Sequence, residues 1–103
     1  MGLFSKKKNK GMTLAELRAF DKRAVSHVVK RRGGDEQIIG RKGAITVKDD
    51  EIVILCNGSE VLRVDTKGAV MATLMSGNGV DIKGTDQNGE SVHAIAYFST
   101  LRQ

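Results

Sequence analysis

The sequence contains no proline and no tryptophan, a single cysteine, Cys56, and only four aromatic side chains among its 103 residues. One thiol excludes an intrachain disulfide and any metal site built from several cysteines. The shortage of aromatics means that the core must be aliphatic and that few rings are left to stack on bases. No apolar run approaches the roughly 20 residues that span a bilayer. No signal peptide is recognisable, so we expect a cytoplasmic protein that meets a membrane, if at all, only at its surface.

Charge is distributed unevenly along the chain. Residues 1–32 hold ten Lys or Arg and two acids, a net charge of +8, whereas residues 33–103 have a net charge of −3. A segregated charge of this kind can bind an anionic surface or dock on the acidic part of the same chain. We therefore divide the chain into a basic flexible tail over 1–11, a helix over 12–34 and one β domain over 38–101.

An amphipathic, basic helix is predicted for residues 12–34. The segment TLAE at 13–16 fits a capping box, and Gly33-Gly34 supplies a C-terminal stop. Apolar residues recur every three or four positions. They form the face expected to dock on the β domain, on a second copy or on a partner: Leu14, Leu17, Phe20, Ala24 and Val28.

The remainder consists of short apolar runs separated by turn clusters. Residues 51–56 predict a central strand, Asn57-Gly58 a tight hairpin turn and residues 60–65 the returning strand. Residues 69–75 fit a helix or a strand, and their shortness favours the strand. Further strands are expected over 44–48, 80–83 and 91–99. The pattern predicts a mainly β fold, an antiparallel meander of about six strands that closes into a small barrel or roll, with a two-sheet sandwich as the alternative.

Residues suited to catalysis are scarce. Nucleophilic catalysis requires a nucleophile, a base and a group that orients the base. Cys56 ends an apolar strand, and the only histidines are His27, on the predicted helix, and His93, on a predicted strand. A Cys56–His93 pair across neighbouring strands is conceivable, but burial of Cys56 as a small hydrophobe is the stronger reading. We predict no catalytic site, no metal site, no cofactor and no small-molecule substrate.

Binding is the more promising activity. The cations expected to contact nucleic acid, another anion or a membrane are Lys6, Lys7, Lys8, Lys10, Lys30, Arg31 and Arg32. We predict a non-enzymatic interaction or structural module whose main partner is a protein or a second copy of the chain. The alternative is a nucleic-acid-binding protein that uses the basic N-terminal part.

Three strand segments carry a resemblance to a known family. They are Glu51-Ile52-Val53-Ile54-Leu55, the return strand over 61–64, and Gly79-Val80-Asp81-Ile82-Lys83-Gly84. This pattern resembles the YabP/YqfC family of small bacterial sporulation-associated proteins over roughly a third of the chain. The resemblance implies a non-catalytic, all-β accessory protein and supplies no binding residue. The basic segment in front and the loop over 84–89 depart from that family's pattern.

Overall fold

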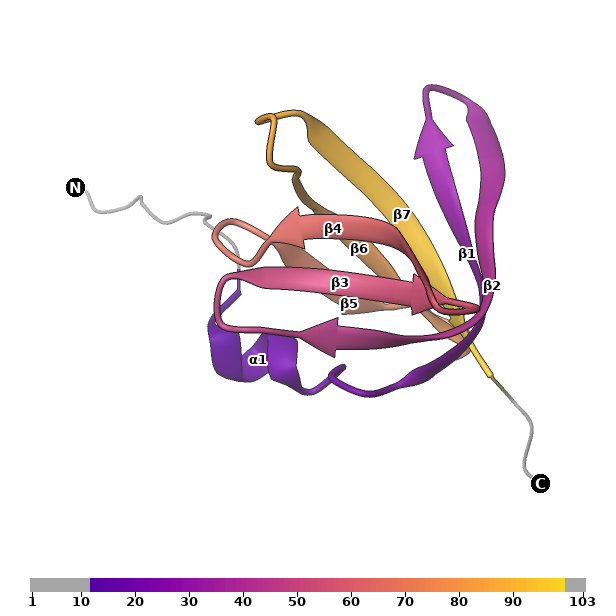
Figure 1. Ribbon diagram of the computed structural model, residues 1–103, viewed down its shortest axis with the longest axis horizontal. Coiled ribbons are helices and arrows are strands. Elements are labelled where there is room, and N and C mark those ends of the chain that lie inside the picture. The colour runs from indigo at the N-terminus through magenta and orange to yellow at the C-terminus, as the bar shows by residue number, and fades with distance from the viewer. Residues whose placement is uncertain (1–11, 100–103) are drawn as a thin grey trace.

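Seven antiparallel strands form one continuous sheet in the order β4-β3-β2-β1-β7-β6-β5 (Figure 1). The computed structural model describes residues 12–99, so the predicted tail with Lys6, Lys7, Lys8 and Lys10 lies outside the described residues. The elements are α1 (Leu14–Arg18), β1 (Ala24–Arg32), β2 (Asp35–Val47), β3 (Glu51–Cys56), β4 (Ser59–Asp65), β5 (Val70–Thr73), β6 (Gly79–Thr85) and β7 (Ser91–Phe98). The mainly β, antiparallel prediction is confirmed, with seven strands instead of about six.

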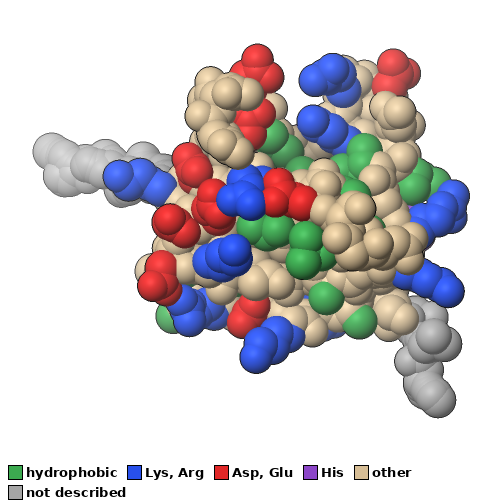
Figure 2. Space-filling model, in the orientation of Figure 1, with side chains coloured by type: hydrophobic (Ala, Val, Ile, Leu, Met, Phe, Trp, Pro, Cys, Tyr) green, Lys and Arg blue, Asp and Glu red, His purple; other side chains and the backbone are tan. Residues whose placement is uncertain are grey.

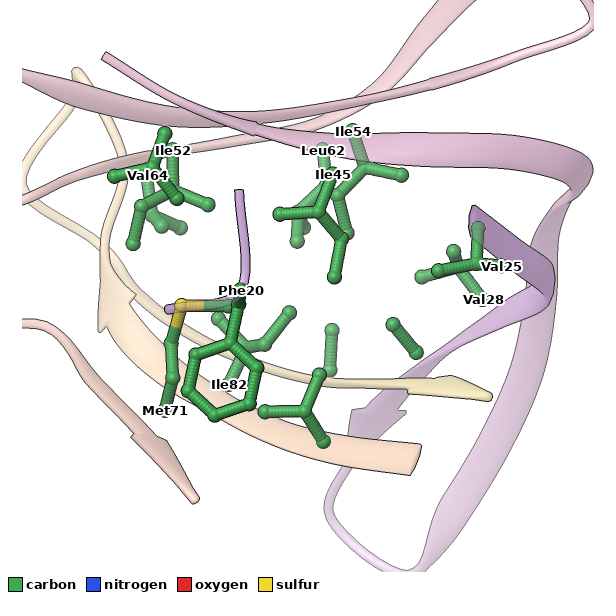
Figure 3. Close-up of a cluster of buried hydrophobic side chains, with 14 of the residues drawn as sticks. Phe20, Val25, Val28, Ile45, Ile52, Ile54, Leu62, Val64, Met71 and Ile82 are labelled. Atoms are coloured by element: carbon green, nitrogen blue, oxygen red, sulfur yellow. The ribbon is translucent and has the colours of Figure 1, made fainter. Parts of the chain in front are cut away.

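The sheet bends so that its two halves face each other across an aliphatic core. Figure 3 shows Ile45, Ile54 and Leu62 of the β2–β4 half opposite Ile82 and Met71 of the β5–β6 half. Each fully buried aliphatic side chain of this kind stabilises the fold by about 2 kcal/mol. Within residues 12–99 the edge strands β4 and β5 do not pair with each other, so the predicted closure into a barrel is not shown.

The helix α1 covers one end of the bent sheet. The predicted capping box is present: the Thr13 hydroxyl accepts a hydrogen bond from the Glu16 amide at 3.2 Å, and the Glu16 carboxylate accepts one from the Thr13 amide at 2.9 Å. Leu17, on the helix, is completely buried, and Phe20, just after it, is 9 % exposed. Leu17 of the helix and Phe20 of the following turn therefore close this end of the core. No helix within residues 12–99 is both long and apolar enough to cross a membrane.

The prediction of a helix over 12–34 is wrong beyond Arg18. After a turn in which the Lys22 amide donates to the Ile45 carbonyl, residues 24–32 form β1 between β2 and β7. Strand β1 is irregular at Ser26, where its register against β7 shifts, so Val25 and Val28 both face the core. A bulge of this kind gives a strand the three-residue spacing that is typical of a helix. The β-branched valines, which favour strands, were the contrary signal.

The tips of two hairpins diverge at the end of the sheet opposite α1. Gly33, which was expected to end a helix, instead has a φ of 64° and turns β1 into β2, as the first central residue of a type II′ turn does. Strand β1 pairs with β7 only as far as Lys30 and Ala94. Beyond that pair, the β1–β2 and β6–β7 hairpins separate (Figure 1).

Candidate functional site

A cavity of about 610 Å³ lies between the separated hairpin tips. Lys30, Arg31 and Arg32 line it from the end of β1, and Lys83 and His93 line it from β6 and β7. No acidic side chain belongs to its lining within the described residues. Figure 2 shows Lys and Arg side chains on the β1–β2 hairpin, across a recess from the β6–β7 hairpin. We call this space the cationic cleft.

Three of the four permanent cations in the cationic cleft are free to meet a ligand. Arg31 Nε lies 3.3 Å from a Glu36 carboxylate oxygen. Among residues 12–99, no carboxylate forms an ion pair with Lys30, Arg32 or Lys83. Like charges gathered without counter-ions repel one another, and an anion between them would relieve that repulsion.

Lys30 is the central residue of the cationic cleft. It lies opposite Ala94, which is fully buried, so the two side chains start from the inner face of the sheet. Lys30 also lines a cavity of about 350 Å³ together with Arg63 and Asp86, and a third of about 340 Å³ together with Arg32 and Asp35. Lys30 is partly buried, and a charge that is partly shielded from water interacts more strongly with an anion than a fully exposed one.

His93, which lines the cleft on the β6–β7 side, is paired with an acid that lies outside the lining. Asp81 on β6 and His93 on β7 are joined by a short contact between the carboxylate and Nε2. Both side chains are about one third exposed. They lie on the outer face, because their chain neighbours Ile82 and Ala94 pair with each other and point into the core. This pair fixes the His93 ring beside Lys83.

The structure separates the two residues that could have formed a catalytic pair. Cys56 is 3 % exposed within the core, where its side chain lies against Gly40 and Gly43 of β2. Burial raises the pKa of the Cys56 thiol. His93 lies on the outer face, bonded to Asp81, so the sheet stands between the thiol and the imidazole. In residues 12–99, no group of three or more His, Cys, Asp or Glu side chains is arranged to hold a metal ion.

A second ion-pair cluster adjoins the cleft on β4. Arg63 donates hydrogen bonds to the carboxylates of Glu60 and Glu51, and these bonds raise the pKa of Arg63. In return, the hydrogen bond from Arg63 lowers the pKa of Glu60. Arg63 is thus neutralised by its neighbours and is a weaker ligand for an external anion than Lys30.

The cations predicted within the described residues do gather at one site, but on a hairpin and not on a helix. Lys30, Arg31 and Arg32 line the cationic cleft together. The predicted docking face is divided between three segments. On α1, Leu14 is half-buried and Leu17 is buried, and Phe20 is buried in the turn that follows. On β1, Val28 is buried but Ala24 is exposed. The sequence did not indicate Lys83 as a site residue, and it indicated His93 only as a possible catalytic base. Their place in the cleft depends on the pairing of β6 with β7 and of β7 with β1, which no local motif marks.

Comparison with known proteins adds no relative. No family model, no curated protein and no solved structure matches the chain. The resemblance to the YabP/YqfC family therefore stays a hypothesis, and any function must be argued from the residues of this structure.

Proposed function

We propose that this chain is a non-enzymatic interaction module that binds an acidic segment of a protein partner in the cationic cleft. One observation carries the proposal: four permanent cations from two different hairpins surround one cavity whose lining contains no acid within the described residues. Lys30 lines the cavity from β1 and Lys83 lines it from β6, so a carboxylate bound there would meet cations of both hairpins. Charge-assisted hydrogen bonds to such a group are about twice as strong as neutral ones.

The balance of charge favours an acidic peptide over a nucleic acid. Residues 12–99 contain twelve Lys or Arg and twelve Asp or Glu, so the described part of the chain carries no net charge. Nucleic-acid binding draws on a broad basic surface that neutralises many phosphates. Here the positive charge is local, and the acids Asp86 and Glu90 stand at the tip of the neighbouring hairpin. A short anionic segment fits this local charge better than a long polyanion does.

A nucleic acid remains the second candidate, because Lys30, Arg31 and Arg32 follow one another on a single hairpin tip. Such a run can follow a phosphate backbone, and the predicted contacts at Lys6, Lys7, Lys8 and Lys10 would extend it. This candidate requires binding that falls steeply as salt is added and that spreads over all these cations.

Fluorescence anisotropy with a labelled oligo-glutamate peptide tests the proposal. The double variant Lys30→Gln/Lys83→Gln removes one cation from each hairpin. We expect its dissociation constant to rise about tenfold or more, because two charge-assisted contacts are lost together. The matched control, Lys48→Gln/Lys67→Gln, removes the same charge from exposed positions outside the cleft and should weaken binding less than about threefold.

Two results would contradict the proposal. Equal weakening in both double variants would mean that the peptide responds to net charge and not to the cleft. Tighter binding of a single-stranded oligonucleotide than of the peptide, lost in Lys30→Gln/Lys83→Gln and strongly salt-dependent, would establish the second candidate instead.

A further inference from the structure

One half of β2 has an unpaired edge. Strand β3 pairs with residues 43–47 of β2, and the last backbone contact on that side is the hydrogen bond of 3.1 Å from the Asn57 amide to the Lys42 carbonyl. Residues 35–42 pair with β1 on one side, and no strand within residues 12–99 pairs with them on the other. Alternate residues of this segment therefore direct backbone N–H and C=O groups away from the protein.

The outermost strands of the sheet are better protected than this segment. Along β5, the Met71 amide donates to the Met12 sulfur at 3.1 Å, and the Met12 amide donates to the Ala69 carbonyl at 3.0 Å. Strand β4 carries the charged pair of Glu60 and Arg63, of the kind that discourages edge pairing. By contrast, the free edge of β2 has an apolar centre, and Ile38 there is 46 % exposed.

The sequence of the free edge is complementary to itself. It reads DEQIIGRK from 35 to 42, with two acids at one end, two cations at the other and two isoleucines between them. When two copies of this segment run antiparallel, the acidic end of each lies beside the basic end of the other. When they run parallel, acid meets acid and cation meets cation. Charge therefore selects the antiparallel arrangement.

The bulge in β2 places the complementary side chains on one face. In the ladder with β1, Glu36 is opposite Arg31, Ile38 is opposite Val29 and Arg41 is opposite His27. These three partners alternate along β1, so Glu36, Ile38 and Arg41 all lie on the outer face. The register shift at Val28/Val29 is what brings Ile38 and Arg41 to the same side. In a two-fold pair of strands, Glu36 of each copy, which pairs with Arg31 of its own chain, can then also face Arg41 of the other copy.

We propose that a second copy of this chain pairs with the free edge of β2, antiparallel over residues 35–42, and extends the sheet across a two-fold axis near Ile38. Main-chain hydrogen bonds supply the contact, the exposed Ile38 side chains meet diagonally near the axis, and the two Glu36–Arg41 pairs fix the direction. An edge of eight residues buries less surface than an obligate dimer does. The association is therefore weak, with a dissociation constant of about 10–100 μM.

Sedimentation velocity of the full chain over a concentration series tests this assembly. The wild type should change from monomer to dimer across the micromolar range. Arg41→Glu alone and Glu36→Arg alone each place two like-charge pairs across the axis, and each should raise the dissociation constant about tenfold or more. An equimolar mixture of the two variants should regain the wild-type dimer, because only the mixed pair restores opposite charges at both ends.

Controls separate this surface from general effects of charge. Lys67→Glu and Glu90→Arg make the same charge changes at exposed sites away from β2, and should leave the dimer unchanged. Ile38→Thr keeps a β-branched residue and should weaken the dimer, whereas Val70→Thr, also at an exposed strand position, should not. A wild type that stays monomeric to about 1 mM, or a mixture that stays as monomeric as its components, would overturn the proposal.

Discussion

Leu17→Ala tests whether α1 is an integral part of the core. Leu17 is completely buried at the end of the bent sheet, and its neighbour Phe20 fills the same end of the core. Truncation removes three carbon atoms and leaves a cavity under a five-residue helix that has little stability of its own. Buried leucine-to-alanine changes cost 2–5 kcal/mol, and we expect about 3 kcal/mol here. For a domain of this size, that lowers the melting temperature by about 15 °C.

Urea unfolding and thermal melts followed by circular dichroism measure the effect. Leu55→Ala is the matched control: it makes the same chemical change on β3, where Leu55 is 44 % exposed, and should cost less than about 1 kcal/mol. If Leu17→Ala were no more destabilising than Leu55→Ala, α1 would be only loosely attached, and its assignment to the hydrophobic core would be wrong.

Three further predictions concern the place where β2 meets β3. Gly43→Ala should destabilise the fold by about 3 kcal/mol, since a Cβ there would lie 1.9 Å from the Leu55 carbonyl oxygen and 2.7 Å from the Cys56 sulfur. The control Gly34→Ala has open space around the added Cβ and should be nearly neutral in the same urea titration. The Cys56 thiol should react with a disulfide reagent much more slowly in the native protein than in urea. The pKa of the Cys56 thiol is higher in the fold than in the unfolded chain, so its contribution to stability is complete below the unfolded pKa and is lost as the pH rises toward the folded pKa. Between about pH 7 and pH 10, the free energy of unfolding should therefore decline less for Cys56→Ala than for the wild type.

Local signals in the sequence predicted most strands correctly. The apolar run at 51–56 is β3, and Asn57-Gly58 forms the predicted turn, with positive φ angles of 52° and 80°. Residues 69–75, which fitted either a helix or a strand, contain β5 (Val70–Thr73). In each case the turn residues bound a run too short for a helix, so local chemistry was sufficient.

The sequence was misleading where a bulge changed the spacing. Val25 and Val28 are both inward on β1, which a regular strand does not allow, and this made a strand look like the continuation of a helix. The consequence is large, because residues 24–32 were expected to belong to a helix that precedes the β domain. Deleting residues 1–32 would in fact remove a strand from the middle of the sheet.

The cationic cleft was only half predictable. The run Lys30-Arg31-Arg32 is visible in the sequence as a cluster of charge, and the structure places all three residues on the cleft. Lys83 and His93 are about fifty and sixty residues further along the chain and reach the cleft through the pairing of β1 with β7 and of β7 with β6. Such register is set by tertiary packing and turn geometry over the whole sheet.

Chemical-shift mapping tests the central claim, that the cationic cleft binds an anionic ligand, most directly. An oligo-glutamate peptide would be titrated into the ¹⁵N-labelled full chain while backbone amide shifts are recorded. The proposed function predicts saturable shifts confined to the two hairpin tips, at residues 30–33, 83–84 and 91–93, and their loss in Lys30→Gln/Lys83→Gln. Shifts spread over all exposed cations, or concentrated outside these three segments, would contradict it.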